Sequence, residues 1–394
     1  MLGALLLVPP ASGAEGASPF FGVVAQEEPS EADFEAMAQG GVGTHRWLIS
    51  WPSLQPSASA QPDWRTTDQM VANLADHDIE PLPFVYGSPC FVVDCERIPR
   101  SEAHRRPPIG TSHARLAWTR FLAALVDRYG SGGSFWSANR SLPYRPITMW
   151  EIWNEENTPR FYGPSPSATG YAELLRISAE TIRSHDRKAR ILVGGMSGDP
   201  RGRGAVDARR FLDDLYGTPR AKRHFDGVAV HPYSRDVAGV ERQILGLRRV
   251  QEAHRDAETP IWVTELGWGT SDTGKGRLVA TVAGQAQRLD EAFGLLLGRR
   301  EEWNVARVLW YSWRDAPGVC GWCSSSGLLE ADGSARPAWA SFAELSGGTP
   351  ATPSGVGDGG SAPLAAIAAA LAIAAVAGAW LLVRRLRSSV EAAP

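Results

Sequence analysis

Eight short β-prone runs alternate with helical patterns along the chain, and this alternation restricts the fold more than any other feature. Alternating strands and helices are typical of a parallel sheet whose strands are joined by helices. The expected strands are 20–25, 43–49, 79–86, 147–157, 190–195, 225–231, 260–268 and 306–312. The expected helices are 30–39, 67–77, 112–129, 167–185, 205–216, 240–254, 276–297 and 338–345.

The count of eight favours a closed (β/α)8 TIM barrel over a doubly wound open sheet, which is the rival fold. Polar residues at the C-terminal ends of several strands favour the barrel as well, because its active sites lie at that end. One run is a poor strand by propensity, since Pro81 and Pro83 lie inside it. Ser30, with Asp33 three residues on, is predicted to cap the first helix.

Two of the strand patterns end in a carboxylate. Glu155 closes the run Ile147–Asn157, and Glu265 lies near the end of the run Pro260–Trp268. Glycoside hydrolysis needs two carboxyl groups, one to protonate the leaving oxygen and one to attack or stabilise the sugar carbon. Glu156 follows Glu155 directly, but both cannot face one pocket from an extended segment, because side chains alternate. We expect Glu156 either to raise the pKa of the acid or to point into solvent.

The motif Trp150-Glu151-Ile152-Trp153-Asn154-Glu155, with Thr264-Glu265 on the seventh strand, resembles the clan A glycoside hydrolases. Family 39, which holds β-xylosidases and α-iduronidases, and the cellulase-like family 5 are the nearest branches. The resemblance covers roughly residues 20 to 345. It implies a (β/α)8 fold and a retaining mechanism with two glutamates.

The resemblance assigns a role to each matched position. Glu155 is the expected general acid/base and Glu265 the nucleophile, and Asn154 is expected to bind the sugar 2-hydroxyl. The remaining substrate-binding candidates are Arg46 near the nucleophile, His231 and Tyr233 after the sixth strand, and Trp313 as an aromatic platform under the sugar. Glu151, inside the strand, is expected to be a structural ion-pair partner. Many relatives have Pro where this chain has Glu156.

The two ends of the chain predict an exported, membrane-anchored protein. The apolar run Leu2–Val8 and the small residues after it resemble a signal peptide, with cleavage near Ala14 or Ala17. The uncharged run 364–383 is long enough to cross a bilayer, and Arg384 and Arg385 then hold the C-terminus in the cytoplasm. The predicted parts are a signal peptide 1–17, a barrel domain 18–345, a Gly/Ser/Pro linker 346–363, a transmembrane helix 364–383 and a cytoplasmic tail 384–394.

The four cysteines form two close pairs, Cys90 with Cys95 and Cys320 with Cys323. In an exported domain, disulfides are a better interpretation than a zinc or redox site. The pairs follow strands three and eight, which are not neighbours in a barrel, so pairing within each loop is favoured over a link between the loops.

We therefore expect an extracellular retaining glycoside hydrolase that acts on a polysaccharide, oligosaccharide or glycoconjugate. The alternatives are a surface carbohydrate-binding protein without activity and a transglycosidase. The chemistry needs carboxylates and water only, so no metal or organic cofactor is implied. The net charge of −3 offers no basic surface for nucleic acid. The expected partners are a carbohydrate substrate and the lipid bilayer.

Overall fold

Eight parallel strands close into a barrel in the computed structural model, which describes residues 17–353. They are β1 (Phe21–Val24), β2 (Thr44–Ser50), β3 (Glu80–Tyr86), β4 (Met149–Ile152), β5 (Arg190–Ser197), β6 (Gly227–His231), β7 (Ile261–Leu266) and β10 (Val305–Tyr311). Neighbouring strands pair in chain order, and β1 closes the ring by pairing Phe21 with Val308 of β10. The predicted (β/α)8 barrel is confirmed, and the open sheet is excluded.

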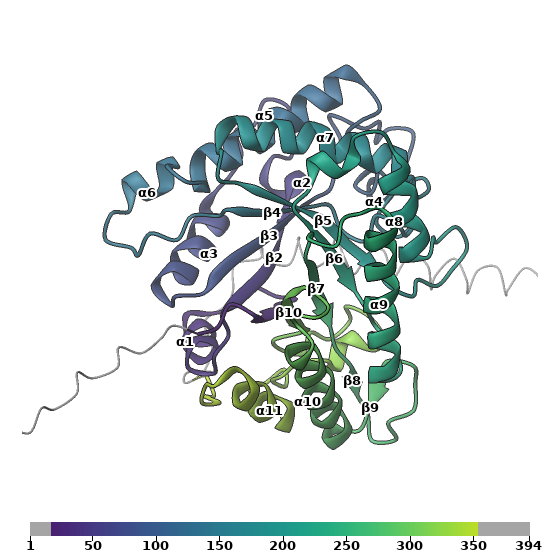
Figure 1. The fold of residues 1–394 in the computed structure, drawn as a ribbon. Coiled ribbons are helices and arrows are strands. Elements are labelled where there is room, and N and C mark those ends of the chain that lie inside the picture. The colour runs from purple at the N-terminus through teal and green to yellow at the C-terminus, as the bar shows by residue number, and fades with distance from the viewer. Residues whose placement is uncertain (1–16, 354–394) are drawn as a thin grey trace, which may run out of the picture.

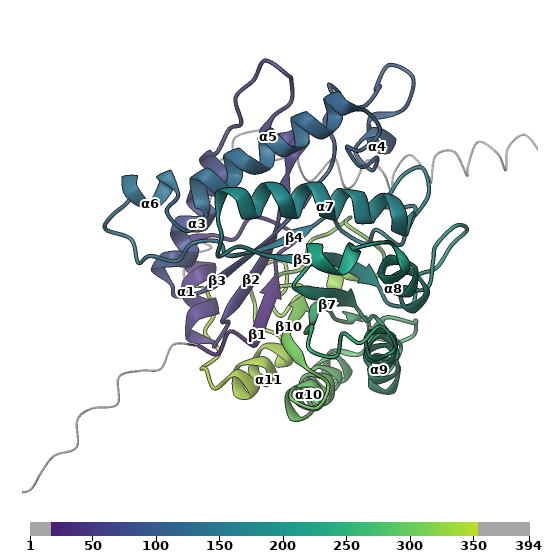
Figure 2. The same ribbon diagram turned by 45° about the horizontal axis from the view of Figure 1, so that its top comes forward.

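The helices lie outside the ring of strands (Figure 1), and α10 and α11 lie together beside β10 (Figure 2). The long helices are α1 (Glu31–Gln39), α3 (Arg65–Asp76), α5 (Ser112–Tyr129), α7 (Ala168–His185), α8 (Ala208–Gly217), α9 (Val237–Ala253), α10 (Val282–Gly298) and α11 (Pro337–Ser346). The loops add the short helices α2 (Trp51–Leu54), α4 (Arg100–Ala103) and α6 (Ser134–Ala138), and the two-residue strands β8 (Gly269–Thr270) and β9 (Val279–Ala280).

Local hydrogen bonds explain where two of the helices begin. The Ser30 hydroxyl accepts from the backbone N–H of Asp33, whose carboxylate accepts from the N–H of Ser30, so the predicted cap of α1 is confirmed. The helix expected at 276–297 begins later than predicted. Residues 279–280 pair with 269–270 as a small strand, and Thr281 then caps α10.

Pro81 and Pro83 fit within β3 because only one side of that part of the strand is paired. The ladder from β3 to β2 begins at Glu80, whereas the ladder to β4 begins at Phe84. In a parallel ladder, alternate residues point their N–H groups to opposite neighbours. The two prolines therefore face the side on which β4 is not yet paired, and no ladder hydrogen bond is lost there.

Most of the tryptophan side chains are part of the core. Those less than 2% exposed are Trp51, Trp118, Trp150, Trp153, Trp268, Trp310, Trp313 and Trp339. Burying one large aromatic side chain contributes about 2 to 3 kcal/mol to folding. The tryptophans thus stabilise the barrel that positions the strand ends.

Disulfides join Cys90 to Cys95 and Cys320 to Cys323, so the predicted pairing within each loop is confirmed. Among residues 17–353, no helix has the length and apolar character of a membrane span. Residues 1–16 of the predicted signal peptide, residues 354–363 of the predicted linker, the predicted transmembrane helix and the predicted tail lie outside the described residues.

Candidate active site

The C-terminal ends of the strands bring six of the seven predicted site residues together. Arg46 comes from β2, Asn154 and Glu155 follow β4, His231 ends β6 with Tyr233 two residues on, and Glu265 lies in β7. Direct contacts link them in one cluster. Trp313 is not part of the cluster.

Arg46 is the buried cation of this cluster. Its Nε and Nη2 donate to the two carboxylate oxygens of Glu151, at 2.7 and 2.9 Å. Nη2 also donates to Asn154 Oδ1 at 2.8 Å, and Nη1 donates to Glu265 Oε1 at 2.6 Å. Burial alone would lower the pKa of the Arg46 guanidinium, but Glu151 and then Glu265 raise it above its ordinary value. The structure confirms Glu151 as an ion-pair partner.

Glu265 is held from both sides. Arg46 binds Oε1, and the Tyr233 hydroxyl donates to Oε2 at 2.7 Å. The side chain is 12% exposed, so one part of the carboxylate is open to a ligand. Burial raises the pKa of Tyr233 well above its usual range, so this hydroxyl keeps its proton. Both contacts stabilise negative charge on Glu265.

Glu155 lies in a different environment. It makes no ion pair with arginine in the described residues, and burial raises the pKa of its carboxyl from 4.5 to about 7, although Arg160 and Arg46 counteract this. Its side chain is 16% exposed, so a ligand can reach it. The two glutamates thus differ in the way that an acid and a nucleophile must differ.

His231 lies between the two carboxyl groups and limits the distance between one oxygen of each. Its Nδ1 lies 3.3 Å from Glu155 Oε1 and 3.5 Å from Glu265 Oε2. These two oxygens are therefore no further apart than the sum of the two distances. Burial lowers the pKa of His231 to about 3, so the ring is neutral at physiological pH. A side chain on Gly195 would lie 1.9 Å from His231 Nε2, so this glycine of β5 makes room for the ring.

The turn after β4 determines which glutamate faces the site. Trp153 and Glu155 have φ angles of 75° and 41°, in the left-handed region that non-glycine residues rarely adopt. The chain therefore leaves the extended conformation, and Glu156 turns into the barrel wall. Strain of this kind is common at functional sites.

Glu156 is fully buried, which corrects the expectation that it points into solvent. Neither of its oxygens has a hydrogen-bond partner in the described residues. Burial raises the pKa of Glu156 well above its ordinary value, which favours the protonated, neutral form of this side chain. A side chain on Gly194 would lie 2.6 Å from Glu156 Oε2, so this glycine makes the space for it. The raised pKa of Glu155 comes from burial and not from Glu156.

Trp313 does not lie in the position that the resemblance implies. Its indole is 1% exposed, donates to Asp33 Oδ1 at 2.8 Å and packs edge-on against Trp339. Tyr311, at the end of β10, takes the place beside the carboxylates. Its ring packs against Tyr233, and burial, followed by the charge of Glu265, raises the pKa of its hydroxyl.

Tyr311 is a site residue that the sequence reasoning missed. The signal was its position next to the end of the predicted strand 306–312, but the aromatic role was assigned to the tryptophan two residues later. Among residues 17–353, no group of three or more His, Cys, Asp or Glu side chains is arranged to hold a metal ion.

Comparison with known proteins agrees with this geometry. The family model described as "Glycosyl hydrolase catalytic core" matches residues 162–342, which include His231 and Glu265. No curated protein matches the sequence. The family model covers a little under half of the chain, and the structural matches share its (β/α)8 barrel, so both agree with the resemblance to the clan A glycoside hydrolases.

Several solved structures share the fold at low sequence identity. A family 39 glycoside hydrolase from Bacteroides cellulosilyticus WH2 is 21% identical with a TM-score of 0.59, over 83% of this chain and 63% of that one. A monomeric β-xylosidase from Caulobacter crescentus CB15 is 18% identical with a TM-score of 0.56, over 84% and 69%. A family 5 enzyme of subfamily 18 from Bifidobacterium longum subsp. infantis is 15% identical with a TM-score of 0.59, over 84% and 79%. This chain thus spans less than two thirds of the first of these.

Proposed function

We propose that the protein is a retaining glycoside hydrolase in which Glu155 is the general acid/base and Glu265 the nucleophile. The observation that carries the proposal is the position of His231 Nδ1, within 3.5 Å of an oxygen from each carboxyl group. Retaining enzymes hold their carboxyl groups about 5 to 5.5 Å apart, and inverting enzymes about 6.5 to 9.5 Å. The upper bound that His231 sets on the distance between these two oxygens supports the shorter, retaining separation.

The environments support this division of roles. A general acid must hold a proton near neutral pH, and the pKa of about 7 at Glu155 meets that need. A nucleophile must carry negative charge, and the hydrogen bonds from Arg46 and Tyr233 stabilise that charge on Glu265. Exchanging the roles would place the acid beside a guanidinium, which disfavours the protonated form.

The reaction proceeds in two displacements. In the first, Glu155 gives its proton to the glycosidic oxygen as the bond from that oxygen to the anomeric carbon breaks, and a Glu265 oxygen bonds to the carbon. The freed alcohol leaves, and a glycosyl ester remains. In the second, the Glu155 carboxylate takes a proton from water, the water oxygen bonds to the same carbon, and Glu265 departs as a carboxylate. Two inversions give net retention.

Asn154 is placed to contact the sugar. Its Oδ1 accepts from Arg46, which orients the amide, and its Nδ2 donates to no group of residues 17–353. This Nδ2 is free to bind a sugar hydroxyl, as the resemblance implies for the 2-hydroxyl. Tyr311 offers its ring beside Tyr233, in the place first expected for Trp313.

The substrate and location are part of the proposal. A β-xylosidase and an exo-β-1,4-mannosidase are among the proteins of the same fold, so β-linked xylose and mannose are the first sugars to test. The run 364–383 and the arginines after it favour a membrane anchor with the barrel outside the cell.

The test is hydrolysis of an aryl β-glycoside panel by the full chain and by the Glu155→Gln and Glu265→Gln variants. We expect both variants to lose nearly all activity on a substrate with a poor leaving group. A good leaving group such as 2,4-dinitrophenol needs no acid, so Glu155→Gln retains the first step on it, whereas Glu265→Gln does not. Equal losses on both substrate types would contradict the assigned roles, and an inverted product would exclude the retaining mechanism.

A further inference from the structure

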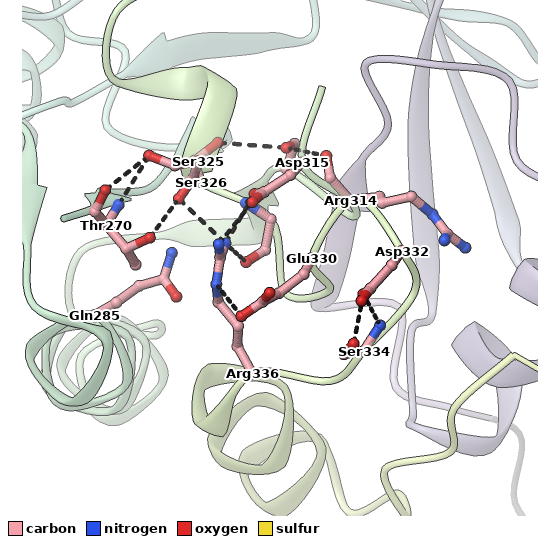
Figure 3. A network of polar contacts seen from close by, with 12 residues as sticks. Thr270, Gln285, Arg314, Asp315, Ser325, Ser326, Glu330, Asp332, Ser334 and Arg336 are labelled. Atoms are coloured by element: carbon pink, nitrogen blue, oxygen red, sulfur yellow. Dashed lines mark hydrogen bonds and ion pairs between the residues drawn. The ribbon is translucent and has the colours of Figure 1, made fainter. Parts of the chain in front are cut away.

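The loop after β10 is built as a rigid support. Arg336 donates to both oxygens of Asp315, at 2.8 and 2.6 Å, and this ion pair is largely buried. Arg336 also donates to the carbonyls of Gly327 and Ser325, and Asp315 accepts from the N–H of Gly327. Figure 3 shows this network between α10 and the start of α11. The two ends of the loop are therefore tied together at its base.

The middle of the loop is held against neighbouring segments. Ser325 donates its hydroxyl proton to the carbonyl of Thr270 and accepts from the N–H of Thr270 (Figure 3). Gln26, in the loop after β1, donates to the carbonyl of Cys323 at 2.9 Å. A side chain on Gly269 would lie 2.0 Å from the carbonyl oxygen of Trp322, so the backbones of the two loops touch.

The tip of the loop is the four-residue ring closed by the Cys320–Cys323 disulfide. The ring contains Trp322, and the Ser324 hydroxyl donates to the Cys320 carbonyl beside it. A disulfide over so short a span, on a base fixed by an ion pair, leaves the Trp322 backbone little freedom. The backbone that carries the indole is thus restrained before any ligand arrives, and the indole packs against Tyr233, which lowers the entropy cost of binding.

Trp322 points toward the active site. Its ring centroid lies 4.8 Å from that of Tyr233 and 6.0 Å from that of Tyr311. Tyr233 bonds Glu265 directly, whereas no hydrogen bond in the described residues joins Trp322 to either glutamate. The indole is only partly buried, unlike those of the core tryptophans. Three aromatic rings from three segments thus pack together on the Glu265 side of the site, and Tyr233 is the one that bonds Glu265.

We propose that Trp322 forms a sugar-binding subsite next to the one where the bond is cleaved, and that the disulfide ring is its positioning device. Aromatic faces in ligand sites bind apolar surfaces, and the C–H face of a pyranose ring is such a surface. The substrate class is accordingly an oligosaccharide or polysaccharide with at least one sugar unit beyond the one attacked. The inference rests on the proposed glycoside hydrolase function.

The experiment compares two substrates of one sugar, an aryl monoglycoside and the tetrasaccharide (xylotetraose, cellotetraose or mannotetraose, whichever the full chain cleaves). For Trp322→Ala we expect KM for the tetrasaccharide to rise about tenfold, the effect of losing one well-packed aromatic contact, with little change for the monoglycoside. Trp322→Phe, which keeps a flat ring, recovers part of the affinity. The double variant Cys320→Ser, Cys323→Ser shows the same selective rise, because the indole is no longer fixed.

Tyr144→Ala is the matched control, because Tyr144 is 62% exposed and precedes β4 at the opposite end of the barrel. The subsite is refuted if Trp322→Ala changes KM for both substrates by the same factor, or for neither. If the full chain cleaves no glycoside, or if Glu155→Gln and Glu265→Gln retain full activity, the proposed function itself fails.

Discussion

Replacing either of the two proposed catalytic glutamates by glutamine should remove nearly all activity on substrates with poor leaving groups, yet the two replacements should change stability in opposite directions. The reason lies in what each carboxyl group contacts. Glu265 accepts hydrogen bonds from Arg46 and Tyr233, whereas Glu155 is buried with little compensation. Glu155→Gln therefore removes a group that the fold accommodates poorly, and Glu265→Gln removes one that the fold is built to hold.

The size of the Glu155 effect follows from its pKa. Burial raises that pKa from 4.5 to about 7. A raised pKa means that the folded state favours the protonated form, so its contribution to stability is complete below pH 4.5 and is lost as the pH rises to 7. A difference of about 2.5 units corresponds to about 3.4 kcal/mol at about 1.36 kcal/mol per unit. Because the side chain is 16% exposed, this value is an upper limit.

The assay is the melting temperature of wild type and variant between pH 4.5 and 8. We expect Glu155→Gln to be the more stable protein at pH 8, by up to about 3 kcal/mol, and the difference to shrink toward zero at pH 4.5. Glu265→Gln should be less stable than wild type at pH 8, by about 1.5 to 3 kcal/mol, since it weakens a hydrogen bond from a charged group. In wild type, kcat/KM should fall above about pH 7 as Glu155 loses its proton.

A Glu155→Gln protein that is no more stable than wild type at any pH would refute the reasoning. It would mean that burial does not destabilise the ionised form of Glu155. The raised pKa on which the assignment of Glu155 as the acid depends would then be wrong. A stabilisation that is the same at pH 4.5 and pH 8 would also contradict it, because a better-packed amide, and not proton linkage, would then be the cause.

Three further outcomes are expected. Arg46→Met leaves Glu151 and Glu265 without their cation and should cost about 3 to 5 kcal/mol of stability in thermal melting, with Arg46→Lys restoring only part, because an ammonium cannot match the guanidinium geometry. Glu156→Gln should stabilise the protein at pH 8 but not at pH 4.5, and should leave kcat within a few fold; a large loss of kcat would show that Glu156 takes part in catalysis. Trp313→Phe should cost about 1 to 3 kcal/mol of stability, because it removes the hydrogen bond to Asp33, and it should leave KM unchanged. A raised KM would show that Trp313 contacts the substrate after all.

The barrel was predictable from the sequence because its signal is repeated eight times, so local errors do not alter the count. The late start of α10 is such an error, since the helical spacing was extended back to residue 276, whereas residues 279–280 pair as a small strand and Thr281 caps the helix. Glu155 and Glu265 were predictable for a related reason. Each comes at the end of a strand, and parallel strands bring their ends to one face.

The orientation of individual side chains was less predictable. Whether Glu155 or Glu156 faces the ligand depends on the left-handed conformations at Trp153 and Glu155, which no residue type there signals. Trp313 was misplaced because β10 ends at Tyr311, one residue before the end of the predicted strand, and the alternation of faces does not apply beyond it. Trp322 reaches the site from a loop. The sequence predicted the disulfide in this loop, but not the direction in which the loop points the Trp322 side chain.

Arg46 and Glu265 are 219 positions apart, yet one hydrogen bond joins them. Arg46 belongs to the second strand of the barrel and Glu265 to the seventh, so the bond forms only when both halves of the chain have met. Until then, Glu265 lacks its arginine, whereas Arg46 can already pair with Glu151 of its own half. The proposed acid/base follows β4 and the proposed nucleophile lies in β7, so a half-barrel released by proteolysis or by stalled synthesis would carry only one of the two carboxyl groups.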